Sequence, residues 1–211
     1  MIIVITDRKI SAEPDFLRQV EVIADSSPDM IILREKDLSE AEYRYLAVEC
    51  MRICSNCNVK FCVNSFIKTA AALNNGRVQV SFGSLTSNAD KLKDFKEIWV
   101  SVHSRGEATE AERMGATHLI YGNVFETSCK PGVEGKGIKE LREVCKAVGI
   151  PVFAVGGIDL STAVAAVNAG CDGVCVRSLM MTSKDPAETV GELRKRIGRG
   201  GSLGRSGSYF V

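Results

Sequence analysis

The sequence lacks most features that mark membrane, secreted or nucleic-acid-binding proteins. None of its 211 residues belongs to an apolar run near the ~20 residues that a membrane-spanning helix needs. The N-terminus enters strand-like sequence at Ile2 without the layout of a signal peptide. The 27 Lys and Arg residues nearly balance the 26 Asp and Glu residues. Because the signs are interspersed, we expect no nucleic-acid partner and no membrane partner. The lack of a spanning run and of a signal-peptide layout leads us to expect a cytoplasmic location.

Cysteine is present, with eight residues, but its pattern does not favour a metal site. Cys50, Cys54 and Cys57 have the C-x3-C-x2-C spacing that holds iron–sulfur clusters in radical enzymes. However, the first two fall in a predicted helix rather than in a loop after the first strand, and no further ligand run accompanies them. Other cysteines lie in or beside apolar segments, where this residue behaves as a small hydrophobe. We therefore expect no metal, no cofactor and no structural disulfide.

Short apolar segments recur along the chain, and each has the composition of a parallel strand buried on both faces. The eight segments are Ile2–Thr6, Met30–Leu33, Lys60–Val63, Arg77–Val80, Glu97–Ser101, His118–Tyr121, Pro151–Val155 and Asp172–Val176. Helix-compatible segments lie between them. The helices predicted in this way are Ala12–Ala24, Ser39–Cys54, Arg105–Met114, Lys139–Val148, Thr162–Asn168 and one that begins at Asp185-Pro186.

This alternation predicts an α/β fold, namely a (β/α)8 TIM barrel that forms a single domain over residues 1–197. A doubly wound sheet is the alternative, but it would show a Gly-rich nucleotide-binding turn after the first strand, and Thr6–Lys9 is not such a turn. Residues 198–211 contain too few apolar side chains to fold, and we expect them to form a flexible tail.

Polar residues that follow the predicted strands are the candidates for chemistry, because the active site of a TIM barrel lies on those loops. His103, one of only two histidines, follows the fifth strand, and imidazole is suited to proton transfer near neutral pH. Arg34 and Lys36 follow the second strand, and Asn64 follows the third. His118 instead opens the sixth strand, so we interpret it as structural.

The last two strands predict a phosphate site. Gly156-Gly157 follows the seventh strand and Arg177-Ser178 follows the eighth, where barrels hold phosphate groups with backbone N–H groups. Arg34 and Lys36 would then neutralise a second anionic group of a small substrate. The alternative is that Arg34 and Lys36 are ordinary surface charges exposed to solvent, as most such residues are.

The chain resembles the thiamine phosphate synthase superfamily from Ile5–Arg8 to Ser178. The shared landmarks are Leu33–Lys36, Asn64, Ser101–His103, Thr127 with Lys130, Ala154–Ile158 and Ala169–Gly173. The resemblance adds Ser101 and Thr127 to the candidate binding residues, whereas Lys130 joins Arg34 and Lys36 as a cation on the long loop after the sixth strand. It also exposes departures from the synthases. Their two magnesium-binding aspartates are replaced by Ser65 and Thr86, the Gln before Leu-Arg-Glu-Lys by Ile32, and a threonine of the long loop by Cys129.

These departures shift the predicted function toward a sister branch. Mg²⁺ prefers carboxylate ligands, so diphosphate departure would lose its usual support. The remaining residues resemble the thiazole tautomerase (TenI) family, whose acid–base histidine matches His103. The resemblance therefore implies a metal-free isomerase that aromatises a carboxythiazole phosphate in thiamine biosynthesis. Its partner would be the thiazole phosphate carboxylate tautomer, and a homodimer is a possible assembly.

Two other functions stay open. One is thiamine phosphate synthase activity, which couples hydroxymethylpyrimidine diphosphate with thiazole phosphate. The other is a non-catalytic regulatory or binding protein that keeps the barrel and the phosphate site.

Overall fold

The chain folds into a closed barrel of eight parallel strands in the order β1 to β8, as a computed structural model shows. The structure describes residues 1–127, 132 and 134–200. The strands are β1 (Ile2–Ile5), β2 (Met30–Leu33), β3 (Lys60–Asn64), β4 (Arg77–Ser81), β5 (Glu97–Val102), β6 (His118–Gly122), β7 (Val152–Val155) and β8 (Gly173–Val176). The pairing of β1 with β8 closes the ring. The predicted (β/α)8 barrel is therefore confirmed.

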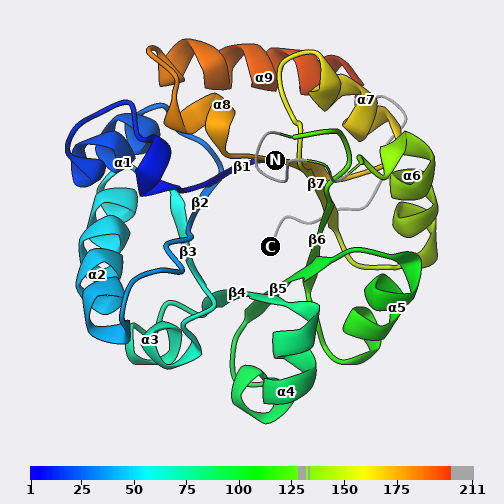
Figure 1. The fold of residues 1–211 in the computed structure, drawn as a ribbon, viewed down its shortest axis with the longest axis horizontal. Coiled ribbons are helices and arrows are strands. Elements are labelled where there is room, and N and C mark those ends of the chain that lie inside the picture. The colour runs from blue at the N-terminus through cyan, green and yellow to red at the C-terminus, as the bar shows by residue number, and fades with distance from the viewer. Residues whose placement is uncertain (128–131, 133, 201–211) are drawn as a thin grey trace.

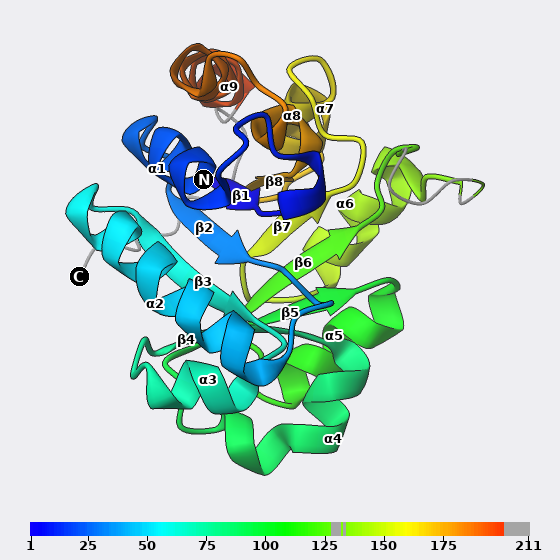
Figure 2. The same cartoon turned by 60° about the vertical axis from the view of Figure 1, so that its left-hand side comes forward.

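Helices form a ring outside the strands, as the view down the barrel shows (Figure 1) and the rotated view repeats (Figure 2). They are η1 (Arg8–Ile10), α1 (Phe16–Asp25), α2 (Glu40–Asn56), α3 (Ile67–Ala72), α4 (Phe82–Leu92), α5 (Arg105–Arg113), α6 (Gly137–Ala147), α7 (Thr162–Asn168), α8 (Ser178–Met181) and α9 (Pro186–Gly200). Among the described residues, no helix combines the length and the apolar character that crossing a bilayer requires.

Several helix boundaries differ from the sequence-based prediction. Helix α1 begins at Phe16 rather than at Ala12, because Asp15 adopts an extended conformation and its carboxylate accepts from the Leu17 N–H as an N-cap. Helix α9 continues to Gly200, so the boundary predicted at 197 falls inside a helix. The rest of the predicted tail, 201–211, lies outside the described residues.

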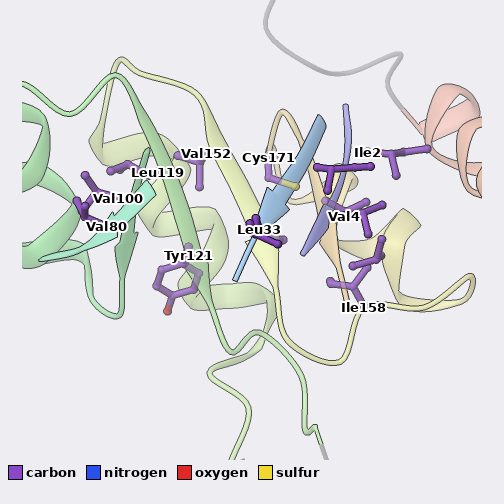
Figure 3. Packing of buried hydrophobic residues seen from close by; sticks show 14 of the residues in the cluster. Ile2, Val4, Leu33, Val80, Val100, Leu119, Tyr121, Val152, Ile158 and Cys171 are labelled. Atoms are coloured by element: carbon purple, nitrogen blue, oxygen red, sulfur yellow. The ribbon is translucent and has the colours of Figure 1, made fainter. Parts of the chain in front are cut away.

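The apolar side chains of the strands fill two layers, because alternate residues point to opposite faces. The outer layer packs strand residues such as Val4, Val80 and Val100 against the helices (Figure 3). The inner layer fills the barrel itself and consists of Ile3, Ile5, Met30, Ile32, Cys62, Trp99, Ile120, Phe153 and Cys175. This two-sided burial explains why the strands read as apolar runs.

An aromatic stack fills the barrel near the beginnings of the strands. Trp99 stacks on His118 with a centroid separation of 4.0 Å and an interplanar angle of 9°, and it also contacts Phe153. The His118 Nδ1 lies 2.8 Å from the Thr117 hydroxyl. Burial lowers the pKa of the His118 imidazole, although Glu97 acts in the opposite direction. The stack therefore favours a neutral histidine.

His118 should make the fold less stable in mild acid. Its pKa is lower in the folded chain than in the unfolded chain, where it is about 6.5, so the unfolded chain binds the proton more readily. The contribution of neutral His118 to the free energy of unfolding is complete above the pKa of the unfolded chain. It is lost as the pH falls from there toward the lower pKa of the folded chain. His118→Phe keeps a ring against Trp99 and removes the proton. Urea unfolding at pH 7.5 and 5.5 should show a smaller pH effect in this variant than in the parent chain, and equal pH effects would contradict the expectation.

Candidate active site at the carboxyl ends of the strands

A cavity of about 320 Å³ opens where the strands end. It brings together all the predicted site residues that the structure describes. They are Arg34, Lys36, Asn64, Ser101, His103, Thr127, Gly156, Gly157, Arg177 and Ser178. Lys130 lies outside the described residues. The roles of these residues in binding and catalysis remain predictions.

One half of this cavity carries the cations and the glycine turn. Strands β7, β8, β1 and β2 are successive neighbours in the ring, and the residues that follow β2, β7 and β8 line the cavity together. We call this the cationic half, and it consists of Arg34, Lys36, Gly156, Gly157, Arg177 and Ser178. An anionic group of a ligand is best accommodated here.

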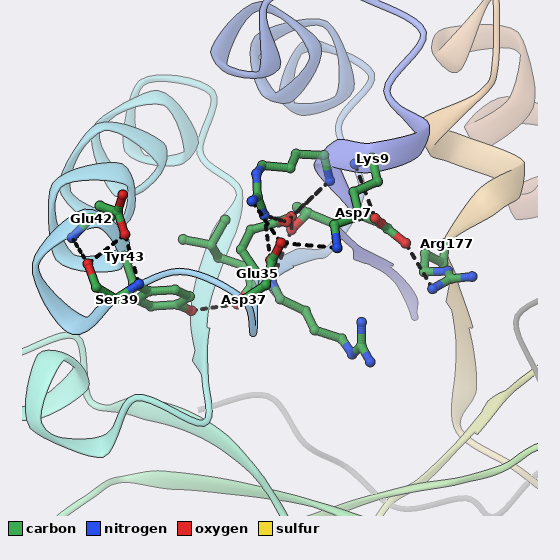
Figure 4. A network of polar contacts seen from close by, with 12 residues as sticks. Asp7, Lys9, Glu35, Asp37, Ser39, Glu42, Tyr43 and Arg177 are labelled. Atoms are coloured by element: carbon green, nitrogen blue, oxygen red, sulfur yellow. Dashed lines mark hydrogen bonds and ion pairs between the residues drawn. The ribbon is translucent and has the colours of Figure 1, made fainter.

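A buried carboxylate positions the loop that carries Arg34 and Lys36. Glu35, between them in the sequence, is only 3 % exposed and does not line the cavity. Its carboxylate accepts from the Thr6 hydroxyl at 2.8 Å and from the Arg8 guanidinium at 3.1 Å (Figure 4). The Thr6 hydroxyl in turn accepts from the Arg34 backbone N–H at 3.0 Å. Burial raises the Glu35 pKa, while the hydrogen bonds from Thr6 and Arg8 lower it.

A second ion pair orients the cation that follows β8. The Arg177 guanidinium lies 2.9 Å from the Asp7 carboxylate, which belongs to the loop after β1 (Figure 4). Both side chains are largely covered, with exposed fractions of 23 % and 17 %. Asp7 therefore offsets part of the charge that Arg177 brings to the cavity, and Arg34 and Lys36 add two further cations to its lining.

The other half of the cavity presents amides and a hydroxyl. Gln79 on β4 donates from Nε2 to the Ser101 hydroxyl at 2.8 Å, and its Oε1 accepts from the Asn64 amide. The Ser101 oxygen already accepts this bond, so its proton can be donated to a ligand. We call Asn64, Gln79, Ser101 and His103 the amide half of the cavity.

His103 completes the amide half, and a backbone carbonyl fixes its tautomer. Its Nδ1 lies 2.5 Å from the Gly122 carbonyl oxygen. A carbonyl can only accept, so Nδ1 carries a proton and a neutral His103 has Nε2 as an acceptor. Its backbone N–H donates to Glu107 at 2.7 Å. The imidazole can therefore accept a hydrogen bond or a proton at the cavity.

The glycine turn after β7 is required by its conformation and its surroundings. Gly156 and Gly157 have φ values of 93° and 64°, in the left-handed region that side chains disfavour. A Cβ on Gly157 would lie 2.4 Å from the Glu126 carbonyl oxygen and 2.6 Å from the Phe125 Cβ. The turn therefore packs directly against the loop after β6, which also brings Thr127 to the cavity.

Sequence reasoning missed several lining residues, of which Gln79 is the most informative. Ser65, Ser81 and Asn123 also line the cavity. A glutamine inside an otherwise apolar strand was an available signal, because a buried amide needs hydrogen-bond partners. Those partners, Asn64 and Ser101, lie on neighbouring strands.

The residues at the two departures from the synthase pattern do not fit a magnesium site. Ser65 lines the cavity, and its hydroxyl donates to the Asn64 Oδ1 at 3.0 Å. Thr86 is exposed on α4, does not line the cavity and donates to the Gly83 carbonyl at 2.8 Å. Both are neutral, whereas Mg²⁺ is usually held by one or two carboxylates.

The comparisons with known proteins agree with one another. Residues 2–180 match the model of a family described as thiamine monophosphate synthase. A thiamine-phosphate synthase of Pyrococcus abyssi is 36% identical over 195 residues, which cover 92% of this chain and 93% of that protein. One from Clostridium acetobutylicum is 31% identical, with coverages of 91% and 93%. The structure of a thiamine phosphate pyrophosphorylase from Pyrococcus furiosus superposes with a TM-score of 0.81 at 28% identity, covering 94% of this chain and 96% of that one.

These findings correct the predicted activity. The prediction of a thiazole tautomerase, and with it of an isomerase, is wrong, because the curated relatives are named as synthases. The prediction gave the greatest weight to Ser65 and Thr86, whereas the similarity extends over nearly the whole barrel. The chain belongs to the thiamine monophosphate synthase family.

Proposed function

We propose that this chain is a thiamine-phosphate synthase, which joins a pyrimidine diphosphate to a thiazole phosphate. The observation that carries the proposal is the division of the cavity into a cationic half and an amide half. Both substrates combine an anionic group with a nitrogen heterocycle. The cationic half suits the anionic groups, and the amide half offers the donors and acceptors that heterocycles require.

The glycine turn is the proposed site of the thiazole phosphate. Gly156 and Gly157 line the cavity after β7, and Ser178, which follows the neighbouring strand β8, lines it as well. Arg34 and Lys36 follow β2 and are the proposed site of the diphosphate. Separate sites for the two anions would hold both substrates in one cavity, and such positioning supplies much of the rate of a two-substrate reaction.

The reaction forms one bond and breaks one. The thiazole nitrogen donates its electron pair to the methylene carbon of the pyrimidine, and the bond from that carbon to the diphosphate oxygen breaks. The diphosphate leaves with the electron pair of the broken bond. Arg34 and Lys36 would stabilise the negative charge that develops on the leaving oxygen, and such stabilisation is commonly a large part of catalysis.

The proposal predicts that the purified chain forms thiamine phosphate and pyrophosphate in equal amounts from hydroxymethylpyrimidine diphosphate and thiazole phosphate. Both products can be followed by chromatography, with parallel reactions in Mg²⁺ and in EDTA. Arg34→Met should lower turnover roughly 10²-fold, as the loss of a group that stabilises a leaving anion commonly does.

Lys146→Met is the matched control, because this exposed residue lies on α6 and pairs only with Glu143 in the described contacts. It should leave turnover unchanged. Failure to form thiamine phosphate in either buffer, by a chain that unfolds cooperatively, would contradict the proposed function.

A further inference from the structure

The charged side chains that line the cavity have one sign among the residues that the structure describes. Among the described residues that line it, Arg34, Lys36 and Arg177 are cationic, and none is an aspartate or a glutamate. A divalent cation at this surface would meet three cations and, among the described lining residues, only neutral oxygen ligands. A multiply charged anion would be attracted, because charge-assisted hydrogen bonds are among the strongest that side chains form.

The acidic residues nearest in sequence to these cations are committed to other partners. Glu35 accepts from Thr6 and Arg8 and is 3 % exposed. Asp37 accepts from Arg8 at 2.6 Å and pairs with Lys9 at 3.0 Å. These bonds to Arg8 and Lys9 hold the pKa of Asp37 below its usual range. Neither carboxylate lines the cavity.

Asp7 is likewise committed, because it pairs with Arg177 at 2.9 Å. A metal ion that recruited Asp7 would have to break this pair. One that recruited Glu35 would compete with the bonds that its carboxylate accepts from the Thr6 hydroxyl and from Arg8. Ser65, which does line the cavity, offers a hydroxyl that already donates to Asn64.

We propose that this cavity binds the diphosphate group as a free anion at Arg34 and Lys36, and that the described residues around it hold no divalent cation for it. The inference rests on the proposed function for the identity of the substrate class. The contacts that carry it, however, are those of the cationic half, so binding can be tested without turnover.

Inorganic pyrophosphate is the probe, and isothermal titration calorimetry in EDTA or in excess Mg²⁺ is the measurement. Binding should persist in EDTA. Mg²⁺ should leave the affinity unchanged or weaken it, because it reduces the negative charge of the ligand in solution. Lys36→Met should weaken binding in EDTA by roughly tenfold, whereas Lys146→Met should not change it.

Ser65→Asp gives the converse test. Asp tolerates the left-handed backbone that Ser65 adopts, with its φ of 66°, so the variant should fold. The new carboxylate should weaken pyrophosphate binding in EDTA and make binding improve when Mg²⁺ is added. This gain of Mg²⁺ dependence distinguishes a charge effect from simple damage to the site.

Two outcomes would overturn the inference: no detectable binding of pyrophosphate in EDTA, or an affinity of the parent chain that rises tenfold or more with Mg²⁺. These outcomes are separate from the coupling assay. Thiamine phosphate formation together with Mg²⁺-dependent binding would support the function and refute the inference. Metal-free binding without coupling would refute the function and support the inference.

Discussion

Gly157→Ala should cause a large loss of both stability and ligand binding. The new Cβ would meet the Glu126 carbonyl oxygen at 2.4 Å, and the φ of 64° disfavours any side chain. Left-handed strain and overpacking each cost about 1–3 kcal/mol. Together they cost about 2–6 kcal/mol, so for a domain of this size the melting temperature should fall by roughly 4–24 °C. Pyrophosphate and thiazole phosphate should bind at least roughly tenfold more weakly, because the turn must move.

Two glycines elsewhere separate the causes of this loss. Gly115 has a φ of 94°, but no atom lies within 4 Å of the position that a Cβ would take, so Gly115→Ala isolates the backbone strain. Gly83 lies in α4 at an ordinary φ with open space around it, so Gly83→Ala should be neutral or slightly stabilising. Thermal unfolding and calorimetry of the three variants make the comparison. If Gly157→Ala behaved like Gly115→Ala in both measurements, the close packing of the turn would not matter.

Glu35→Gln should weaken anion binding although Glu35 does not line the cavity. Three donors converge on its carboxylate: the Thr6 hydroxyl, the Arg8 backbone N–H and the Arg8 guanidinium. An amide of the same shape has one acceptor oxygen, so its NH₂ group would face at least one of these donors. A hydrogen bond to a charged group contributes about 1.5–3 kcal/mol, and we expect a loss of unfolding free energy of that order.

The effect on binding follows from the same contacts. Thr6 holds the Arg34 backbone, so loosening Thr6 spreads Arg34 and Lys36 over more conformations. Pyrophosphate affinity should fall roughly tenfold. Asp37→Asn is the control, because Asp37 also bonds Arg8 but its side chain is 42 % exposed, so solvent screens this pair and its loss should change stability little. Equal losses in the two variants, measured by urea unfolding and calorimetry, would show that Glu35 has no special role.

The strands were predictable from sequence because a strand buried on both faces is a short, nearly continuous run of apolar residues. Met30–Leu33 was predicted with its observed bounds, and the other strands to within two residues at each end. Helix α3 was not predicted, since it has only six residues and no side-chain cap. Helix α4 was also missed. It is capped by Ser81, but its polar sequence and the non-helical Asn88 interrupt the periodicity.

The position of the site followed from topology, whereas its hydrogen bonds did not. Residues that end parallel strands must meet at one end of a barrel, so Arg34, His103 and Arg177 were found without any contact information. The Gln79 amide is different, because its partners lie on two other strands. The role of Glu35 was also hidden, since a glutamate between two cations in a loop has the sequence signature of a solvated residue.

The seam between β1 and β8 has a consequence for synthesis on the ribosome. The barrel closes only when Ile2, Ile3 and Val4 pair with Val174, Cys175 and Val176. Until the last strand emerges, a nascent chain with the earlier strands assembled would present two unpaired sheet edges, which are templates for aggregation. The native ring can therefore form only after almost the whole barrel has been translated. The incomplete barrel that exists before β8 emerges is the state in which chaperone protection matters most.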